Sequence, residues 1–135
     1  MHKLVASIKY RPINILSILS VASLYLVNNK FIKPNTKGLI HVFFVSYFND
    51  LLCPCLFLAY TNLLLITCGR EVIYLKTLLL LSLVAGCVWE FASPYLKSGA
   101  VTDPIDFLCY IFGAIAYWSL LKSRIKLDGG KNDRS

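Results

Sequence analysis

Charge is scarce in this sequence. Of its 135 residues, 16% are charged and 57% are hydrophobic, and the mean hydropathy is +0.64. A soluble domain of this length carries more charge and less apolar surface, so the composition argues against a soluble fold. A membrane-spanning helix needs about 20 apolar residues, so four such helices use most of the chain and leave no room for a separate soluble domain.

Acidic residues and catalytic motifs are scarcer still. Seven Asp and Glu stand against 14 Lys and Arg, for a net charge of +7. Because the apolar stretches hold almost none of these bases, the positive charge should lie beside the bilayer and favour contact with anionic membrane lipid. Nucleic acid is not the expected partner, since binding it requires a continuous cationic face on a soluble fold. No nucleophile elbow, phosphate-binding loop or HExxH motif is present, so no enzyme class is recognised.

The cysteines show neither a disulfide pattern nor a metal-binding pattern. They are five, an odd number, and they lie within or at the ends of apolar stretches. Cys53 and Cys55 are separated by one residue, where redox and zinc motifs have two or more. We expect all five to be small buried hydrophobic residues.

Four apolar stretches predict an all-α, integral membrane four-helix bundle. A single membrane domain is expected over residues 1–127, with a flexible polar tail over 128–135. The four spans are predicted at about 12–32, 51–67, 72–92 and 104–121.

The second apolar stretch is too long for one span. As a helix, residues 36–67 would be about 48 Å long, against a hydrocarbon thickness of about 30 Å. A break is expected at Asn49 and Asp50, because Asp50 can cap a new helix whose first turn contains Pro54. Residues 37–48, which include His41, would then form a short interfacial or re-entrant helix.

The distribution of bases predicts the orientation. Four spans place both termini on one side of the membrane. That side carries more bases than the other: Lys3, Lys9, Arg11, Arg70, Lys76, Lys122, Arg124 and Lys126, against Lys30, Lys33, Lys37 and Lys97. Bases concentrate on the cytoplasmic side, so both termini are predicted to be cytoplasmic.

Several polar residues should meet on the opposite, outward-facing side. Asp50 begins the second span, Glu90 lies near the end of the third, Asp103 and Asp106 begin the fourth, and His41 precedes the second. Neighbouring carboxylates cannot all stay charged without a cation, a base or a shared proton. Glu90 and Asp106 could therefore hold Mg²⁺ or Ca²⁺, which would attract a lipid phosphate.

The spacing within the last two spans supports this convergence. Two stripes are predicted, one on each helix: Ser82, Gly86, Glu90 and Ser93, and Asp103, Asp106, Tyr110, Gly113 and Tyr117. If the stripes face each other, Gly86 contacts Gly113 and Glu90 meets Asp106.

Helix capping is a simpler account of some of these acids. Asp103, Pro104 and Asp106 match the N-cap, N1 and N3 positions of a helix, and Asp50 is open to the same interpretation. Glu90 cannot be explained as a cap in this way, because it lies near the negative C-terminal end of a helix dipole, which does not stabilise a carboxylate. Glu90 is therefore the strongest candidate for a functional role, and Lys97 in the loop that follows is a candidate partner.

A spaced acid pattern in the last third of the chain resembles a known family. Glu90, Asp103, Asp106 and Gly113 match, in order, the end of the VanZ-like family. Lys37 and His41, ahead of Tyr47, look like that family's Lys and His, whereas its Gln, Arg and Asn are replaced by Ser93, Ala100 and Tyr110. The resemblance implies a small multi-span protein associated with bacterial envelope function and glycopeptide-antibiotic resistance, without a settled reaction.

The leading hypothesis is a bacterial inner-membrane protein with an outward-facing acidic site for an envelope lipid or precursor head group, bound directly or through a divalent cation. The expected ligand-binding residues are His41, Asp50, Glu90, Lys97, Asp106 and Tyr110. Two alternatives stay open. One is a membrane enzyme that acts on a lipid head group with Glu90 or Asp106 as general base. The other is a structural or accessory subunit whose helices pack against a second copy or a partner protein through Ser82, Gly86 and Gly113.

Overall fold

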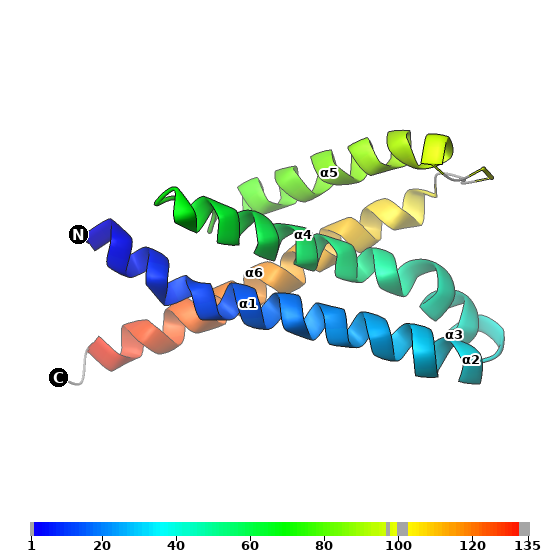
Figure 1. Cartoon of the computed structure of the whole chain (residues 1–135), viewed down its shortest axis with the longest axis horizontal. Coiled ribbons are helices and arrows are strands. Elements are labelled where there is room, and N and C mark those ends of the chain that lie inside the picture. The colour runs from blue at the N-terminus through cyan, green and yellow to red at the C-terminus, as the bar shows by residue number, and fades with distance from the viewer. Residues whose placement is uncertain (1, 97, 100–102, 133–135) are drawn as a thin grey trace.

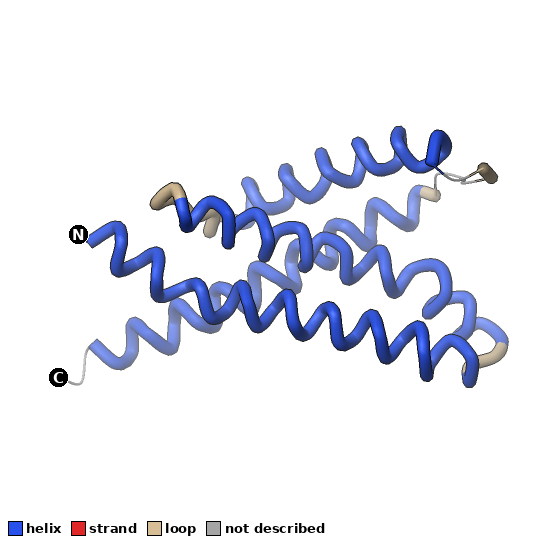
Figure 2. Tube along the Cα trace, viewed as in Figure 1, coloured by secondary structure: helices blue, strands red, loops and turns tan. Residues whose placement is uncertain are grey.

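The computed structural model describes residues 2–96, 98–99 and 103–132, and in these residues it contains helices and no strand. Four long helices cross one another in a loose bundle (Figures 1 and 2). They are α1 (His2–Val27), α4 (Phe48–Thr67), α5 (Leu75–Leu96) and α6 (Pro104–Asn132). The prediction of an all-α four-helix bundle is confirmed.

Four helical segments are long and apolar enough to cross a membrane. By length and composition they are Pro12–Asn35, Gly38–Thr67, Leu75–Leu96 and Pro104–Lys126. Large apolar side chains such as Leu19, Leu80 and Phe112 point out of the bundle and are about 60% exposed. Lipid tails would cover these side chains, so the chain has the character of a multi-pass membrane protein. Both termini lie at one end of the bundle, together with the α4–α5 connection (Figure 1).

Two π-helical segments extend the first two spans. One, η1 (Asn28–Ile32), leads from α1 into α2 (Lys33–Asn35), and the other, η2 (Phe43–Tyr47), leads from α3 (Gly38–Val42) into α4. The fully buried Asn28 links the two, because its Nδ2 donates hydrogen bonds to the carbonyl of Phe44 (2.9 Å) and to Oδ1 of Asn49 (3.1 Å). These bonds tie the end of the first span to the start of α4.

The break expected at Asn49 and Asp50 is absent. The chain is helical from Gly38 to Thr67, and Asp50 lies in the first turn of α4 rather than capping a new helix. A helix of this length measures about 45 Å, so it must tilt or bend to fit a bilayer. The π-helical η2 allows a bend without a break, and Figure 1 shows α3 turned away from the axis of α4.

The last two helices end later than predicted, and α5 begins at Leu75 rather than at residue 72. The third was expected to end at residue 92, before Pro94, but α5 includes Pro94 and ends at Leu96. The fourth was expected to end near residue 121, but α6 continues to Asn132, through part of the segment expected to be a flexible tail.

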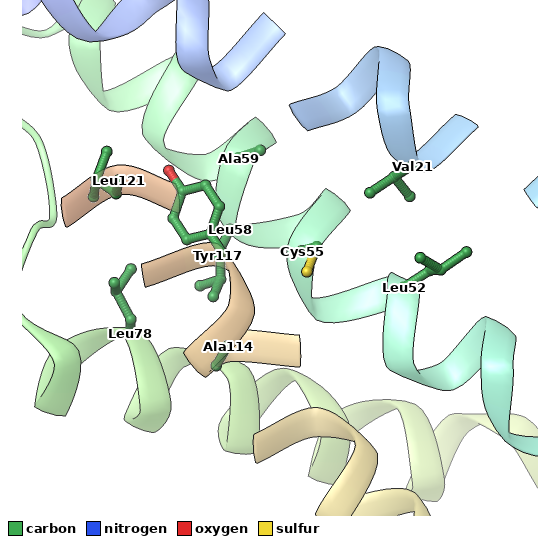
Figure 3. Packing of buried hydrophobic residues seen from close by; sticks show 9 residues of the cluster. All are labelled: Val21, Leu52, Cys55, Leu58, Ala59, Leu78, Ala114, Tyr117 and Leu121. Atoms are coloured by element: carbon green, nitrogen blue, oxygen red, sulfur yellow. The ribbon is translucent and has the colours of Figure 1, made fainter. Parts of the chain in front are cut away.

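Helix α4 is the centre of the bundle, and it packs against α1 and α6, whereas α5 packs mainly against α6. The core includes Leu58 and Ala59 of α4 and Tyr117 and Leu121 of α6, none of them more than 1% exposed (Figure 3). Gly113 sets the α4–α6 distance, because a Cβ there would lie 2.5 Å from the carbonyl oxygen of Leu51. Because α5 contacts α4 much less than it contacts α6, a groove is left between α4 and α5.

Candidate acidic site

Three helices bring carboxylates together at the end of the bundle opposite the termini. Asp50 comes from α4, Glu90 from α5 and Asp106 from α6, and each lies close enough to the other two for their charges to interact. Asp103, in the residue before α6, interacts with Asp106 in the same way. The acidic site is defined here as Asp50, Glu90, Asp103 and Asp106. It contains four of the seven acidic residues of the chain.

Tyr110 organises the centre of this site. Its hydroxyl donates a hydrogen bond to Oε1 of Glu90 at 3.1 Å, and its own carbonyl accepts one from the Ser82 hydroxyl at 3.0 Å. The ring packs against Gly86, where any Cβ would overlap the ring carbons. Glycine at position 86 therefore lets the tyrosine reach the carboxylate one turn further along α5.

The predicted contact between Gly86 and Gly113 is wrong. Gly86 packs on the ring of Tyr110, and Gly113 packs on Leu51 and Pro54 of α4. The stripe on α6 is divided between two neighbours, because α6 packs against both α4 and α5. Tyr110 contacts α5, whereas the carbonyl of Gly113 accepts a hydrogen bond from Sγ of Cys55 at 3.0 Å.

Asp103 has two structural contacts. Oδ1 accepts a hydrogen bond from the backbone N–H of Ile105 (3.0 Å), which is N-cap geometry, and Oδ2 accepts one from the hydroxyl of Tyr47 (3.0 Å). The Asp106 carboxylate also hydrogen-bonds the backbone of Asp103, as in a capping box. Tyr47 was not among the expected ligand residues, and its place in η2 brings its hydroxyl to α6. The N-terminal end of α6 is thereby linked to the second span.

Asp50 and Glu90 each precede a proline by four residues. Pro54 and Pro94 lie inside α4 and α5, and proline has no N–H to donate to the carbonyl of the residue four positions earlier. The main-chain carbonyls of Asp50 and Glu90 therefore lack their regular helical donors. In the described part of the chain, the half-buried Asp50 carboxylate accepts no hydrogen bond either. The site thus has unused acceptor capacity besides its negative charge.

The other expected site residues are placed differently. Nδ1 of His41 lies 3.3 Å from the hydroxyl of Thr36, in the connection between the first two spans. Lys97 lies outside the described residues. Among the residues that are described, no three His, Cys, Asp or Glu side chains are arranged to hold a metal ion. Asp50, Glu90 and Asp106 are therefore close enough to interact electrostatically but are not arranged around a single metal position.

An apolar groove adjoins the acidic site between α4 and α5. Its volume is about 440 Å³, and its walls include Pro54 and Phe57 from α4 and Trp89 and Ala92 from α5. The ring of Tyr110 also lines it. Because the hydroxyl of the same tyrosine bonds Glu90, the groove and the carboxylates share a wall.

Comparison with known proteins adds no family: no protein-family model, curated protein or solved structure matches this chain. The resemblance to the VanZ-like family therefore stays a prediction.

Proposed function

We propose that this membrane protein binds an amphiphile with a positively charged head group and one alkyl chain. The head group sits against Asp50, Glu90 and Asp106, and the chain occupies the groove between α4 and α5. The observation that carries the proposal is the meeting of carboxylates from three helices beside an apolar groove.

The chemistry of the site favours an organic cation. An ammonium group attracts several carboxylates at once and does not demand the fixed ligand geometry of a metal ion. The carbonyl oxygens of Asp50 and Glu90, left without helical donors by Pro54 and Pro94, add partial negative charge that favours a cation. A cationic head group would also remove the repulsion between the carboxylates.

The cellular setting belongs to the same proposal. The excess of bases on the side of the termini favours cytoplasmic termini, which puts the acidic site on the outer side of the membrane. An amphiphile of the bacterial envelope would meet the site there. The VanZ-like pattern around Glu90 and Asp106 agrees with such a role.

Trp89 provides a direct test, because it lines the groove and is one of two tryptophans in the chain. In a Trp118→Phe background, purified protein in dodecyl maltoside micelles is titrated with dodecyltrimethylammonium. We expect a saturable change in Trp89 fluorescence. Tetramethylammonium, the same head group without the chain, should compete only weakly if the groove binds the chain.

The carboxylate variants test the head-group site. Asp50→Asn and Glu90→Gln should each weaken binding about tenfold, equivalent to about 1.4 kcal/mol for one lost charge interaction. Glu71→Gln is the matched control, because it removes an acid at the opposite end of the bundle and should leave binding unchanged. Equal affinity in all four proteins would refute the proposal. Displacement of the amphiphile by millimolar Mg²⁺ or Ca²⁺, lost in Glu90→Gln, would instead identify a divalent cation as the ligand.

A further inference from the structure

A second polar cluster lies inside the bundle, in the half that carries the termini. Its centre is the hydroxyl of Tyr117 on α6, which donates a hydrogen bond to Oδ1 of Asn14 on α1 (2.6 Å). The same hydroxyl accepts one from Nδ2 of Asn62 on α4 (2.8 Å). All three side chains are buried, with no more than 1% of any of them exposed. One phenol therefore joins three helices in an apolar interior.

The cluster also holds the connection between α4 and α5. Oδ1 of Asn62 accepts a hydrogen bond from the N–H of Val72 (2.8 Å), and its Nδ2 donates to the carbonyl of the same residue (2.9 Å). Glu71, the residue before Val72, is thereby brought beside the cluster, and its carboxylate interacts electrostatically with Tyr117. The position of Glu71 thus follows from the two bonds to its neighbour.

Two buried atoms of the cluster have no hydrogen-bond partner. One is Nδ2 of Asn14, which can only donate, and the other is Oε1 of Glu71, which as a carboxylate oxygen can only accept. A buried polar group without a partner is costly, and a single buried water that accepts from one group and donates to another removes both losses. The complementary character of the two atoms therefore points to a shared ligand near Tyr117.

We propose that Glu71 and Asn14 hold a buried water molecule beside Tyr117, and that Glu71 takes up a proton from solvent at this site. The proton adds to the carboxylate and forms a neutral carboxylic acid, so no other reactant is needed. Because Val72 is fastened to the same cluster, the charge of Glu71 governs how firmly the α4–α5 connection docks on the bundle. The site is separate from the acidic site, and its ligands are a proton and water.

Burial raises the pKa of Glu71 from its usual 4.5 to about 7. Tyr117 on α6 is a titratable group that interacts electrostatically with Glu71. Asn14 and Asn62, which α1 and α4 contribute to the described cluster, do not titrate. A raised pKa means that the folded protein binds the proton more tightly than the unfolded chain does. The resulting stabilisation is complete below about pH 4.5 and is lost as the pH rises through about 7.

Infrared spectroscopy of the full chain in detergent micelles tests the site directly. The carbonyl band of a protonated carboxylic acid should disappear between pH 5 and 9 with a midpoint near 7. The component of the band with a midpoint near 7 should be missing in Glu71→Gln. It should persist in Asp50→Asn and in Glu90→Gln, which alter only the protonation of the acidic site. A wild-type midpoint below pH 5, or an unaltered band in Glu71→Gln, would overturn the proton site whatever the outcome for amphiphile binding.

A second variant tests the part played by Asn14. Asn14→Asp keeps the oxygen that accepts the hydrogen bond from Tyr117, but it replaces Nδ2, the donor without a partner, by a second oxygen. The midpoint of the Glu71 titration should therefore rise by at least one pH unit. An unchanged midpoint would refute the water-mediated link. Thermal unfolding gives an independent measure. The melting temperature of the wild type should fall between pH 5 and 8, and the fall should be smaller in Glu71→Gln, which lacks the Glu71 contribution.

Discussion

Replacing Gly86 by alanine should destabilise the protein, although alanine is the better helix former. In an exposed helix the substitution would stabilise by roughly 0.5–1 kcal/mol. At position 86 the new methyl group would overlap the Tyr110 ring, and the ring carbon nearest the backbone, Cγ, would lie only 3.2 Å away. The ring cannot swing aside freely, because the carbonyl of Tyr110 is bonded to Ser82 and its hydroxyl to Glu90.

The expected net effect is a loss of roughly 2–5 kcal/mol in the free energy of unfolding. Overpacking a filled site costs about 1–3 kcal/mol, and a displaced ring also loses a hydrogen bond to a charged group worth about 1.5–3 kcal/mol. The gain in helix propensity offsets only part of this. Equilibrium unfolding in mixed detergent micelles, followed by the helical circular dichroism signal, measures the difference.

A double-mutant cycle separates the ring contact from a general effect of the substitution. In a Tyr110→Ala background the methyl group meets no ring, so Gly86→Ala should change sign and stabilise by up to about 1 kcal/mol. Val84→Ile adds one methyl group to an exposed position of the same helix and should be neutral. The proposed packing is refuted if Gly86→Ala stabilises the wild type, or if its effect is the same in both backgrounds.

Three further predictions concern packing, the buried network and topology. Gly113→Ala should lower the free energy of unfolding by at least about 3 kcal/mol, because the carbonyl oxygen of Leu51 and the ring of Pro54 both lie 2.5 Å from the new Cβ. A neutral result in the same unfolding assay would contradict the close α4–α6 contact. Tyr117→Phe should lower the free energy of unfolding by about 2–4 kcal/mol, because two buried hydrogen bonds are lost. Tyr60→Phe, at a position 54% exposed, should leave the free energy of unfolding unchanged. Ser98→Cys, in a chain without the five native cysteines, should react with an impermeant thiol reagent added to intact cells, and labelling only after lysis would reverse the proposed orientation.

Composition and hydropathy alone determined the class of the protein. Apolar stretches of about 20 residues can satisfy their backbone hydrogen bonds in lipid only as helices, so four of them predict four membrane helices without any tertiary information. The capping contact of Asp103 is equally local, since its partner, Ile105, is two residues away. The approximate meeting of Asp50, Glu90 and Asp106 followed from alternating the spans through the membrane.

The contacts within the bundle were decided by the tertiary structure. Which neighbour a stripe of α6 faces depends on the rotation and crossing of three helices, so the sequence could not show that Gly86 faces Tyr110 and Gly113 faces α4. The second span also has a long-range contact that its own sequence does not show, because the buried Asn28 on the first span bonds the carbonyl of Phe44 inside η2. Asn14, Asn62 and Tyr117 stand in separate spans, and only the packing of those spans joins them into one network. Sequence periodicity assigns a residue to a face of its own helix, but the partner of that face is set by packing between segments far apart in the chain.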